Sequence, residues 1–266
     1  MANHYTAHKD EWKVLANIDY YGMFVKSYIP FNAWLNVCYQ TLNTDRAKIN
    51  EIKKVSNPFK SKICSLFDSD SQDGAAFRNA IGDLHYLLEN HYIYNKDERI
   101  TFTHIIIGKN QDNISESSNR GIGFRVQYGN RTPNNTETTT LIKHRDESAI
   151  FSFTQQDYNL AELKTNRNFM SLTENYQQII VNCYERVNPN VIEDFTKNVD
   201  SKKESTYYQC GIYKLKRNNE LFAAALIEII YKMRNTLFHG ELIPDKDANK
   251  TYGAAYKILR ILIDAI

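Results

Sequence analysis

Residues 221–240 read LFAAALIEIIYKMRNTLFHG and decide how the rest of the chain is interpreted. Apolar side chains recur at three- and four-residue intervals along this stretch, which is the period of a helix. The run closes at Gly240, and glycine commonly supplies the left-handed residue that ends a helix. We therefore predict a long helix over residues 218–238. It carries Arg234, Asn235 and His239 to its C-terminal end.

Arg234 and His239 together offer a cation and an acid/base group. On a continuous helix, residues five apart are turned by roughly 140°, so we expect the helix to stop between them. His239 then lies at the negative end of the helix dipole, which favours imidazolium, and histidine is suited to general acid/base chemistry. The guanidinium of Arg234 presents a planar fork to a phosphate. The amide of Asn235 can orient either partner.

The spacing alone is not specific. Arg99 and His104 share it, but they lie in an alternating strand pattern, where residues five apart point to opposite faces. Arg78 and His85 share a predicted helix face, where a surface stripe on an amphipathic helix is the simpler interpretation. For Arg234 and His239 the simpler alternative is a surface arginine and a histidine that caps a helix. The apolar helix before them, Asn235 and Gly240 distinguish this pair from the others.

The remaining sequence predicts a mainly α protein with an inserted antiparallel sheet, α+β overall. Pro30 is expected at a helix start, and Asn57-Pro58 at a helix end. The other predicted helices are 11–26, 31–55, 75–90, 173–186 continuing to about 199, and 249–266. Alternating stretches predict strands over 99–107, 121–128, 138–143 and 149–153, separated by polar loops at 109–120 and 129–137. The expected divisions are N-terminal helices over 1–96, a β-rich insertion over 97–155, and C-terminal helices over 156–266.

Composition narrows the classes of function. The 266 residues carry a formal net charge of +2, so any nucleic-acid site must be a local patch. The four cysteines form no C-x-x-C pair, which argues against a disulfide framework or a zinc site. We find no glycine-rich phosphate loop and no cluster with metal-ligand spacing, so we expect neither cofactor nor metal. Without a signal peptide or an apolar stretch of bilayer length, we expect a cytoplasmic protein that does not enter membranes.

The segment 234–240, with the apolar helix before it and the final helix after it, resembles the HEPN superfamily. The signature of that family is an arginine, usually followed by a polar residue, and a histidine after a gap of four to six residues. The resemblance covers about the last 60 residues at the level of the motif. It implies a helical bundle, and the 97–155 insertion departs from the minimal form of that bundle.

The resemblance also implies a metal-independent endoribonuclease that forms a homodimer through its motif-bearing helices. His239 would deprotonate the RNA 2′-hydroxyl or protonate the leaving oxygen, Arg234 would stabilise charge on the phosphate, and Asn235 would hold the arrangement. The products would be a 2′,3′-cyclic phosphate and a 5′-hydroxyl. Family members commonly act as toxins or effectors in toxin–antitoxin, abortive-infection and other antiviral defence systems, so an antitoxin or another defence protein is an expected partner.

Basic and aromatic residues near the motif suit single-stranded RNA, although a solvated linker explains them equally well. They are Lys214, Lys216, Arg217, Tyr231 and Lys232. The main alternative function is a non-catalytic HEPN module that binds RNA, a nucleotide or a partner protein. The polar loops of the insertion motivate this alternative, because a bare nuclease does not need them. A third hypothesis is an unrelated helical protein in which the motif arises by chance.

Overall fold

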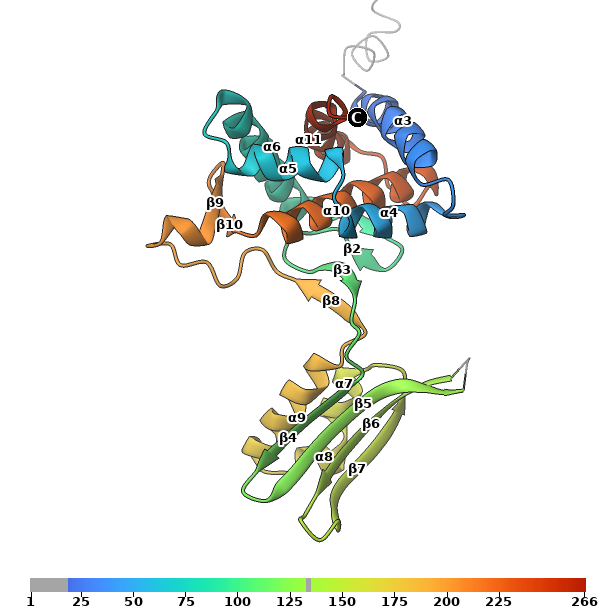
Figure 1. Ribbon diagram of the computed structural model, residues 1–266, viewed down its shortest axis with the longest axis vertical. Helices are drawn as coiled ribbons and strands as arrows, with labels where there is room; N and C mark the ends of the chain where they lie inside the picture. Colours follow the sequence, from blue (N-terminus) through green and yellow to red (C-terminus); the bar gives the residue numbers. More distant parts are fainter. Residues whose placement is uncertain (1–18, 133–134) are drawn as a thin grey trace, which may run out of the picture. The chain divides into compact units, whose positions relative to one another are not determined.

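The structure is a computed structural model that describes residues 19–132 and 135–266, and it divides into two compact units (Figure 1). The first, called the helical unit, comprises residues 19–107 and 193–266. The second, called the sheet unit, comprises residues 108–192. The chain is thus a mixed α+β protein, as the sequence predicted. Within the described residues, no helix combines the length and hydropathy that crossing a bilayer requires.

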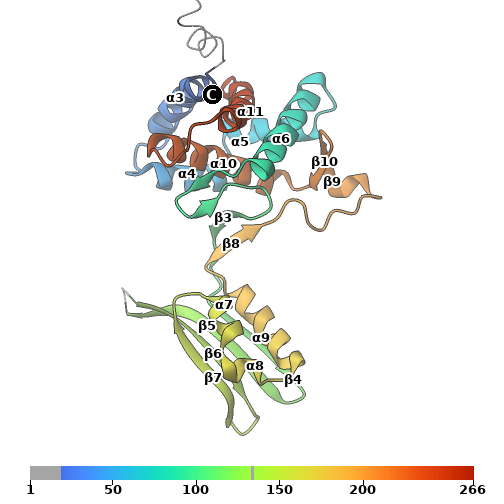
Figure 2. The ribbon, with the colours of Figure 1, turned by 180° about the vertical axis from the view of Figure 1, so that it is seen from behind.

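The helical unit is built around one central helix, α10, against which helices from both ends of the chain pack (Figure 2). Its helices are α3 (Tyr20–Cys38), α4 (Asp45–Lys54), α5 (Pro58–Asp68), α6 (Gln72–Asn90), α10 (Asn219–Phe238) and α11 (Lys246–Ile263). Two short antiparallel pairs accompany them: β1 (Tyr94–Asn95) with β2 (Glu98–Arg99), and β9 (Tyr207–Cys210) with β10 (Tyr213–Lys216). A 3-10 turn, η1 (Glu204–Thr206), precedes β9.

Helix α10 forms where the opening stretch of sequence predicts it. Asn218 caps its N-terminus by accepting a hydrogen bond from the Leu221 amide at 3.1 Å. At the other end Gly240 has φ +67°, and the Glu241 amide donates back to the Thr236 carbonyl at 3.0 Å. This pattern is a Schellman motif and it stops the helix. Most residues from Phe222 to Met233 are buried, because α10 has neighbours on more than one side.

The prediction that a helix starts at Pro30 is wrong. The helix runs through this proline, although proline removes a backbone donor and crowds the preceding turn. Buried side chains at helical spacing on both sides of Pro30 hold α3 against the core (Phe24, Tyr28, Phe31 and Leu35). The predicted helix over 31–55 is instead the end of α3 and a separate α4, whose N-terminus Thr44 caps. The part of the predicted 11–26 helix before residue 19 lies outside the described residues.

Helix α5 was not expected, because Asn57-Pro58 was interpreted as a stop alone. The same pair also starts a helix. Asn57 accepts a hydrogen bond from the Lys60 amide at 2.9 Å, and Pro58 occupies the first turn, where its missing N–H costs nothing. The Asn57 side-chain amide also donates to the Ile52 carbonyl at 2.9 Å, near the end of α4. One residue therefore both ends α4 and begins α5.

The sheet unit is a four-stranded antiparallel sheet, in the order β4-β5-β6-β7, with its own core. The strands are β4 (Ile114–Asn119), β5 (Ile122–Thr132), β6 (Asn135–Lys143) and β7 (Ala149–Gln156). Three helices follow: α7 (Leu160–Thr165), α8 (Arg167–Met170) and α9 (Glu174–Arg186). Side chains from both layers share one cluster, among them Phe124, Val126, Ile142, Ile180 and Tyr184.

These boundaries differ from the sequence-based divisions at 97–155 and 156–266. Residues 98–99 form β2 in the helical unit, and β3 (Ile105–Lys109) pairs with β8 (Asn190–Glu193) rather than with the four-stranded sheet. The predicted loop 109–120 contains β4, and the helical pattern expected up to about 199 gives way to β8. Helix α9 packs on the sheet, not in the helical unit. Alternation identifies a strand, but it does not identify the strand's partner.

Candidate functional site

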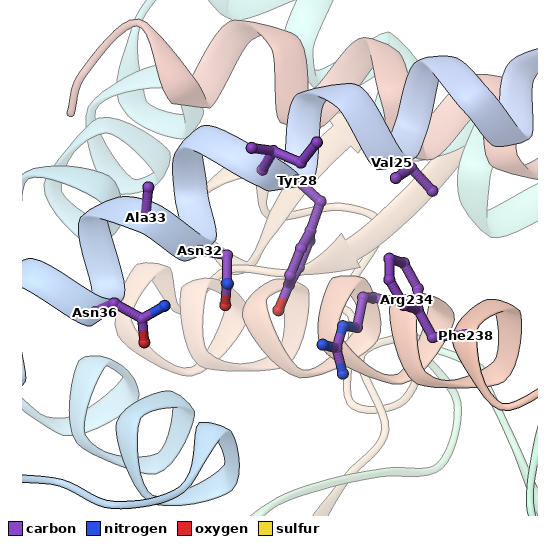
Figure 3. Close-up of a pocket in the computed structure, with 8 residues that line it drawn as sticks. Val25, Tyr28, Asn32, Ala33, Asn36, Arg234 and Phe238 are labelled. Atoms are coloured by element: carbon purple, nitrogen blue, oxygen red, sulfur yellow. The ribbon is translucent and has the colours of Figure 1, made fainter.

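A cavity of about 290 Å³ lies between α3 and α10, and Arg234 is part of its wall. Figure 3 shows Tyr28 and Asn32 extending from α3 toward α10 and the ring of Phe238 extending from α10 toward α3, with the guanidinium of Arg234 beside α10. The residues that line the cavity are Val25, Tyr28, Ile29, Asn32, Ala33, Asn36, Arg234 and Phe238. The helices pack here because α3 and α10 belong to the same hydrophobic core, which includes Tyr28. We call this space the α3–α10 cavity.

The guanidinium of Arg234 is held in place on several sides. Its Nη1 donates to Asn235 Oδ1 at 2.9 Å, and its Nη2 lies 3.4 Å from Asp45 Oδ2. The guanidinium carbon lies 4.7 Å from the centre of the Phe238 ring and 5.8 Å from that of Tyr28. Among the residues that the structure describes, none accepts a hydrogen bond from the buried Nε. Arg234 is therefore a pre-oriented cation, and the 20% of its side-chain surface that stays accessible suits an anionic group.

Tyr28 contributes a neutral phenol to this wall. Burial raises the pKa of its hydroxyl above the ordinary tyrosine value, and the nearby positive charge of Arg234 offsets only part of that effect. The ring is 4% exposed. At neutral pH the hydroxyl is therefore a hydrogen-bond donor or acceptor and not a phenolate base.

His239 lies just beyond the cavity, as the C-cap residue of α10. Its amide donates to the Asn235 carbonyl at 2.9 Å, and its side chain is exposed. It is not among the residues that line the α3–α10 cavity. The prediction that the helix ends between Arg234 and His239 is confirmed, because α10 ends at Phe238. Within one chain, Arg234 faces the cavity and His239 faces solvent.

The basic residues on and after β10 are engaged in contacts away from Arg234. Lys214 Nζ donates to the Ser201 carbonyl at 3.1 Å, and Lys216 Nζ pairs with a carboxylate oxygen of Glu193 at 2.5 Å. Arg217 pairs with Asp68 at 3.1 Å. Arg217 remains partly exposed, with 42% of its side-chain surface accessible. These residues belong to the β9–β10 hairpin region and do not line the α3–α10 cavity.

Tyr231 and Lys232, also predicted to contact RNA, are buried within the helical unit. Tyr231 is 7% exposed and lies under the guanidinium of Arg46 at 4.4 Å from its ring centre. Lys232 is 5% exposed and pairs with Glu98 at 2.6 Å. They are buried because α10 is covered on the side from which they project. Neither side chain is part of an accessible surface in this structure.

The competing pair Arg78 and His85 has structural roles. Arg78 Nη1 donates to carbonyls at the end of α5, including that of Ser69 at 2.6 Å. His85 is 3% exposed and packs edge-on against Phe102 and Tyr213. Burial lowers the pKa of its imidazole, and its Nδ1 has no hydrogen-bond partner within residues 19–132 and 135–266. The expectation of an exposed surface stripe is therefore wrong for His85.

No sequence pattern indicated that several of the residues around Arg234 lie close to it. Asp45, Asn32 and Tyr28 come from α3 and from the start of α4, far from Arg234 along the chain. Nothing in local spacing could associate them with the motif.

Among the described residues, no group of histidine, cysteine and carboxylate side chains is arranged to hold a metal ion. No protein-family model, curated protein or solved structure matches this chain.

Proposed function

We propose that the protein is a metal-independent endoribonuclease of the HEPN type. The observation that carries this proposal is the state of Arg234, which is oriented by Asn235 at the wall of a cavity and keeps 20% of its side-chain surface accessible. A guanidinium in this setting suits the charge that builds on a phosphate in a transition state. The exposed imidazole of His239 follows at the end of the same helix. The motif thus supplies a phosphate-binding cation and a proton-transfer group.

The proposed reaction breaks a phosphodiester by internal attack. The RNA 2′-oxygen bonds to phosphorus while the bond from phosphorus to the 5′-oxygen breaks, giving a 2′,3′-cyclic phosphate and a 5′-hydroxyl. The imidazole of one His239 accepts the proton of the 2′-hydroxyl, and the protonated imidazole of the other protomer's His239 donates a proton to the leaving 5′-oxygen. Arg234 stabilises the phosphorane oxygens, and Asn235 keeps the guanidinium in position. This chemistry requires no metal to balance its protons or charge.

A second copy of the chain completes the proposed site. His239 and the Arg234 face of α10 diverge within one protomer, so a two-fold axis near the end of α10 would bring an imidazole to each arginine. Exposed apolar side chains near the cavity suit such an interface: Ile29 is 61% exposed and Phe238 is 54% exposed. The homodimer is thus part of the proposal.

The test is cleavage of a mixed single-stranded RNA by the purified full chain in the presence of EDTA. We expect cleavage with cyclic-phosphate ends, and a loss of about 10²-fold or more for His239→Ala and Arg234→Ala. Matched controls are His104→Ala, an exposed histidine, and Arg260→Ala, an exposed arginine on α11. Wild-type protein that cuts no RNA, or a His239→Ala variant that cuts as well as wild type, would refute the proposal.

The biological setting proposed is an effector or toxin of a prokaryotic antiviral defence or toxin–antitoxin system that acts in the cytoplasm. Expression in a bacterial host should then arrest growth, and His239→Ala should relieve the arrest at equal protein level. An antitoxin or another defence-system protein is the partner we propose to look for. Growth arrest that persists in the His239→Ala variant argues against this setting.

The alternative is a non-catalytic module that binds RNA, a nucleotide or a partner protein. The sheet unit favours it, because residues 108–192 form their own core and carry none of the motif residues. This alternative predicts binding that survives His239→Ala, with no cleavage by either form. The RNA assay above therefore separates the two functions.

A further inference from the structure

The four-stranded sheet of the sheet unit ends in a strand with one open edge. Strand β7 pairs with β6 on one side, and within the described part of the chain no segment pairs with its other side (Figure 1). The Asp157 amide donates to the Thr136 carbonyl at 2.8 Å, so every second residue pair from there along the ladder is hydrogen-bonded. The backbone N–H and C=O groups of Ser152, Thr154 and Gln156 therefore point away from β6.

The sequence of β7 gives this edge no protection against pairing. Proteins usually protect an exposed strand edge with charged side chains, proline or a bulge. Strand β7 reads AIFSFTQQ over Ala149–Gln156 and contains neither a charged residue nor a proline. The irregularity in its register lies at the start of the strand, opposite Ile142 and Lys143. Strand β4, at the other edge of the sheet, instead carries the exposed carboxylate of Glu116 and packs against α9.

Contacts within the sheet unit already hold β7 in the extended form that pairing requires. On the face that the helices cover, Phe151 is buried and packs against Phe169 of α8, with ring centres 6.0 Å apart. Gln155 is buried on the same face, and its side-chain amide donates to the Asn159 carbonyl at 2.7 Å. Because these contacts fix the strand beforehand, pairing with another strand costs little further conformational entropy.

We propose that the open edge of β7 is a self-association surface, on which β7 of a second copy of the chain pairs in antiparallel orientation. Such a contact is isologous, with a two-fold axis at its centre. The register that uses all three outward-pointing residues places Thr154 opposite Thr154 of the second copy, and Ser152 opposite Gln156. One continuous sheet then runs through both copies. This inference is independent of the proposed ribonuclease function, which concerns the helical unit.

The chemistry of β7 favours its own copy as the partner. A two-fold axis brings identical side chains together, and like charges directly opposite each other would destabilise the pair, but β7 has no charges. The side chains of Ser152, Thr154 and Gln156 are exposed on the open face of the sheet, and hydroxyl pairs across strands stabilise antiparallel sheets. On the other face Phe153 is half-buried, so pairing removes further apolar surface from water.

The first test measures hydrogen exchange of the full chain at low micromolar and at millimolar protein concentration. The amides of Thr154 and Gln156 should exchange about tenfold more slowly at the higher concentration, because each gains a hydrogen bond. Thr154→Lys places two like charges at the axis and should abolish this change. The matched control is Ser118→Lys, which adds the same charge at an exposed position of β4 and should preserve it. Exchange rates that do not depend on concentration overturn the proposal, and so does a dependence that survives Thr154→Lys.

The second test is a disulfide cross-link at the proposed axis, in a Cys38→Ser background because Cys38 is an exposed free thiol. Hydrogen-bonded partners in an antiparallel pair have Cα atoms about 5.5 Å apart, which lies within the range that a disulfide spans. Thr154→Cys should therefore give a covalent dimer under mild oxidation, and Ser118→Cys, on the other edge, should not. Equal yields from the two variants overturn the pairing. Neither test involves RNA, so this proposal and the ribonuclease proposal fail separately.

Discussion

Replacing Glu228 with glutamine should destabilise the helical unit more than any other single charge removal on α10. Glu228 is 2% exposed, and Arg46 Nη1 donates to both of its oxygens at 2.8 Å. Lys53 Nζ donates to the same carboxylate at 2.7 Å and is itself buried. The glutamine variant retains the volume but leaves a buried lysine without a counter-ion. The substitution therefore removes the charge of residue 228 without changing the volume of its side chain.

Removing one partner of a buried ion pair costs about 3–5 kcal/mol. The side chain of Arg46 is 43% exposed, so water screens part of its charge and the lower half of that range applies here. A loss of about 3 kcal/mol corresponds to a decrease in melting temperature of roughly 6–12 °C for a unit of this size. Lys53 carries most of the cost, because 6% of its side chain is exposed.

The loss of stability caused by Glu228→Gln should depend on pH. Burial alone raises the pKa of Glu228, but the charges of Lys53 and Arg46 outweigh burial and hold it below the ordinary value of 4.5. The pKa of Lys53 is lowered as well, because its burial outweighs the single carboxylate that it faces. A depressed carboxyl pKa contributes stability above the unfolded-state value that is lost as the pH falls through the folded-state value. The difference between wild type and Glu228→Gln should therefore shrink as the pH decreases below about 4.5.

The assay is hydrogen exchange of the α10 amides together with thermal unfolding. The matched control is Asp264→Asn at the end of α11, because both side chains of its pair with Arg260 are more than half exposed. That control should change the free energy of unfolding by less than about 1 kcal/mol. Equal destabilisation by the two substitutions, or a change below about 1 kcal/mol for Glu228→Gln, refutes the reasoning.

Other substitutions test particular elements. Gly240→Ala places a side chain at φ +67° and should cost about 1 kcal/mol, measured by thermal unfolding; no change would contradict the role of the Schellman motif. Burial lowers the pKa of His85, so stability should decrease as the pH falls below about 6.5, where the unfolded chain takes up a proton. His85→Phe should remove that dependence. Asp45→Asn frees Arg234 from its carboxylate and should lower the KM for RNA several-fold; an unchanged or higher KM would argue against competition by Asp45.

Local sequence was sufficient to predict a helix or strand wherever the segment itself contains the residues that start, continue or end that element. The helix over 218–238 was predicted from an apolar period and a terminal glycine, and the structure adds the cap at Asn218. The strand patterns at 121–128, 138–143 and 149–153 correspond to β5, β6 and β7. Each of these elements satisfies its backbone hydrogen bonds in the way that its own residues favour. The position of His239 at the helix end followed from the same reasoning.

Predictions from local sequence were wrong where contacts with distant segments of the chain determine the structure. Pro30 reads as a helix boundary, yet packing of the residues around it carries α3 through. Residues 99–107 alternate like the strands of the four-stranded sheet, but β2 pairs with β1 and β3 with β8. Helix α9 has an ordinary amphipathic pattern, which does not show that its apolar face covers the sheet. In each case the deciding contact comes from a distant part of the chain.

The sequence by itself determined the helix that carries the motif, its end at Gly240, and the separation of Arg234 from His239. Only the tertiary structure placed Tyr28, Asn32 and Asp45 around Arg234, and only it buried Tyr231 and Lys232. The physical reason is the range of the interactions. Caps and helical periods act over a few residues, whereas a cavity wall forms when α3 packs against α10 from nearly the other end of the chain.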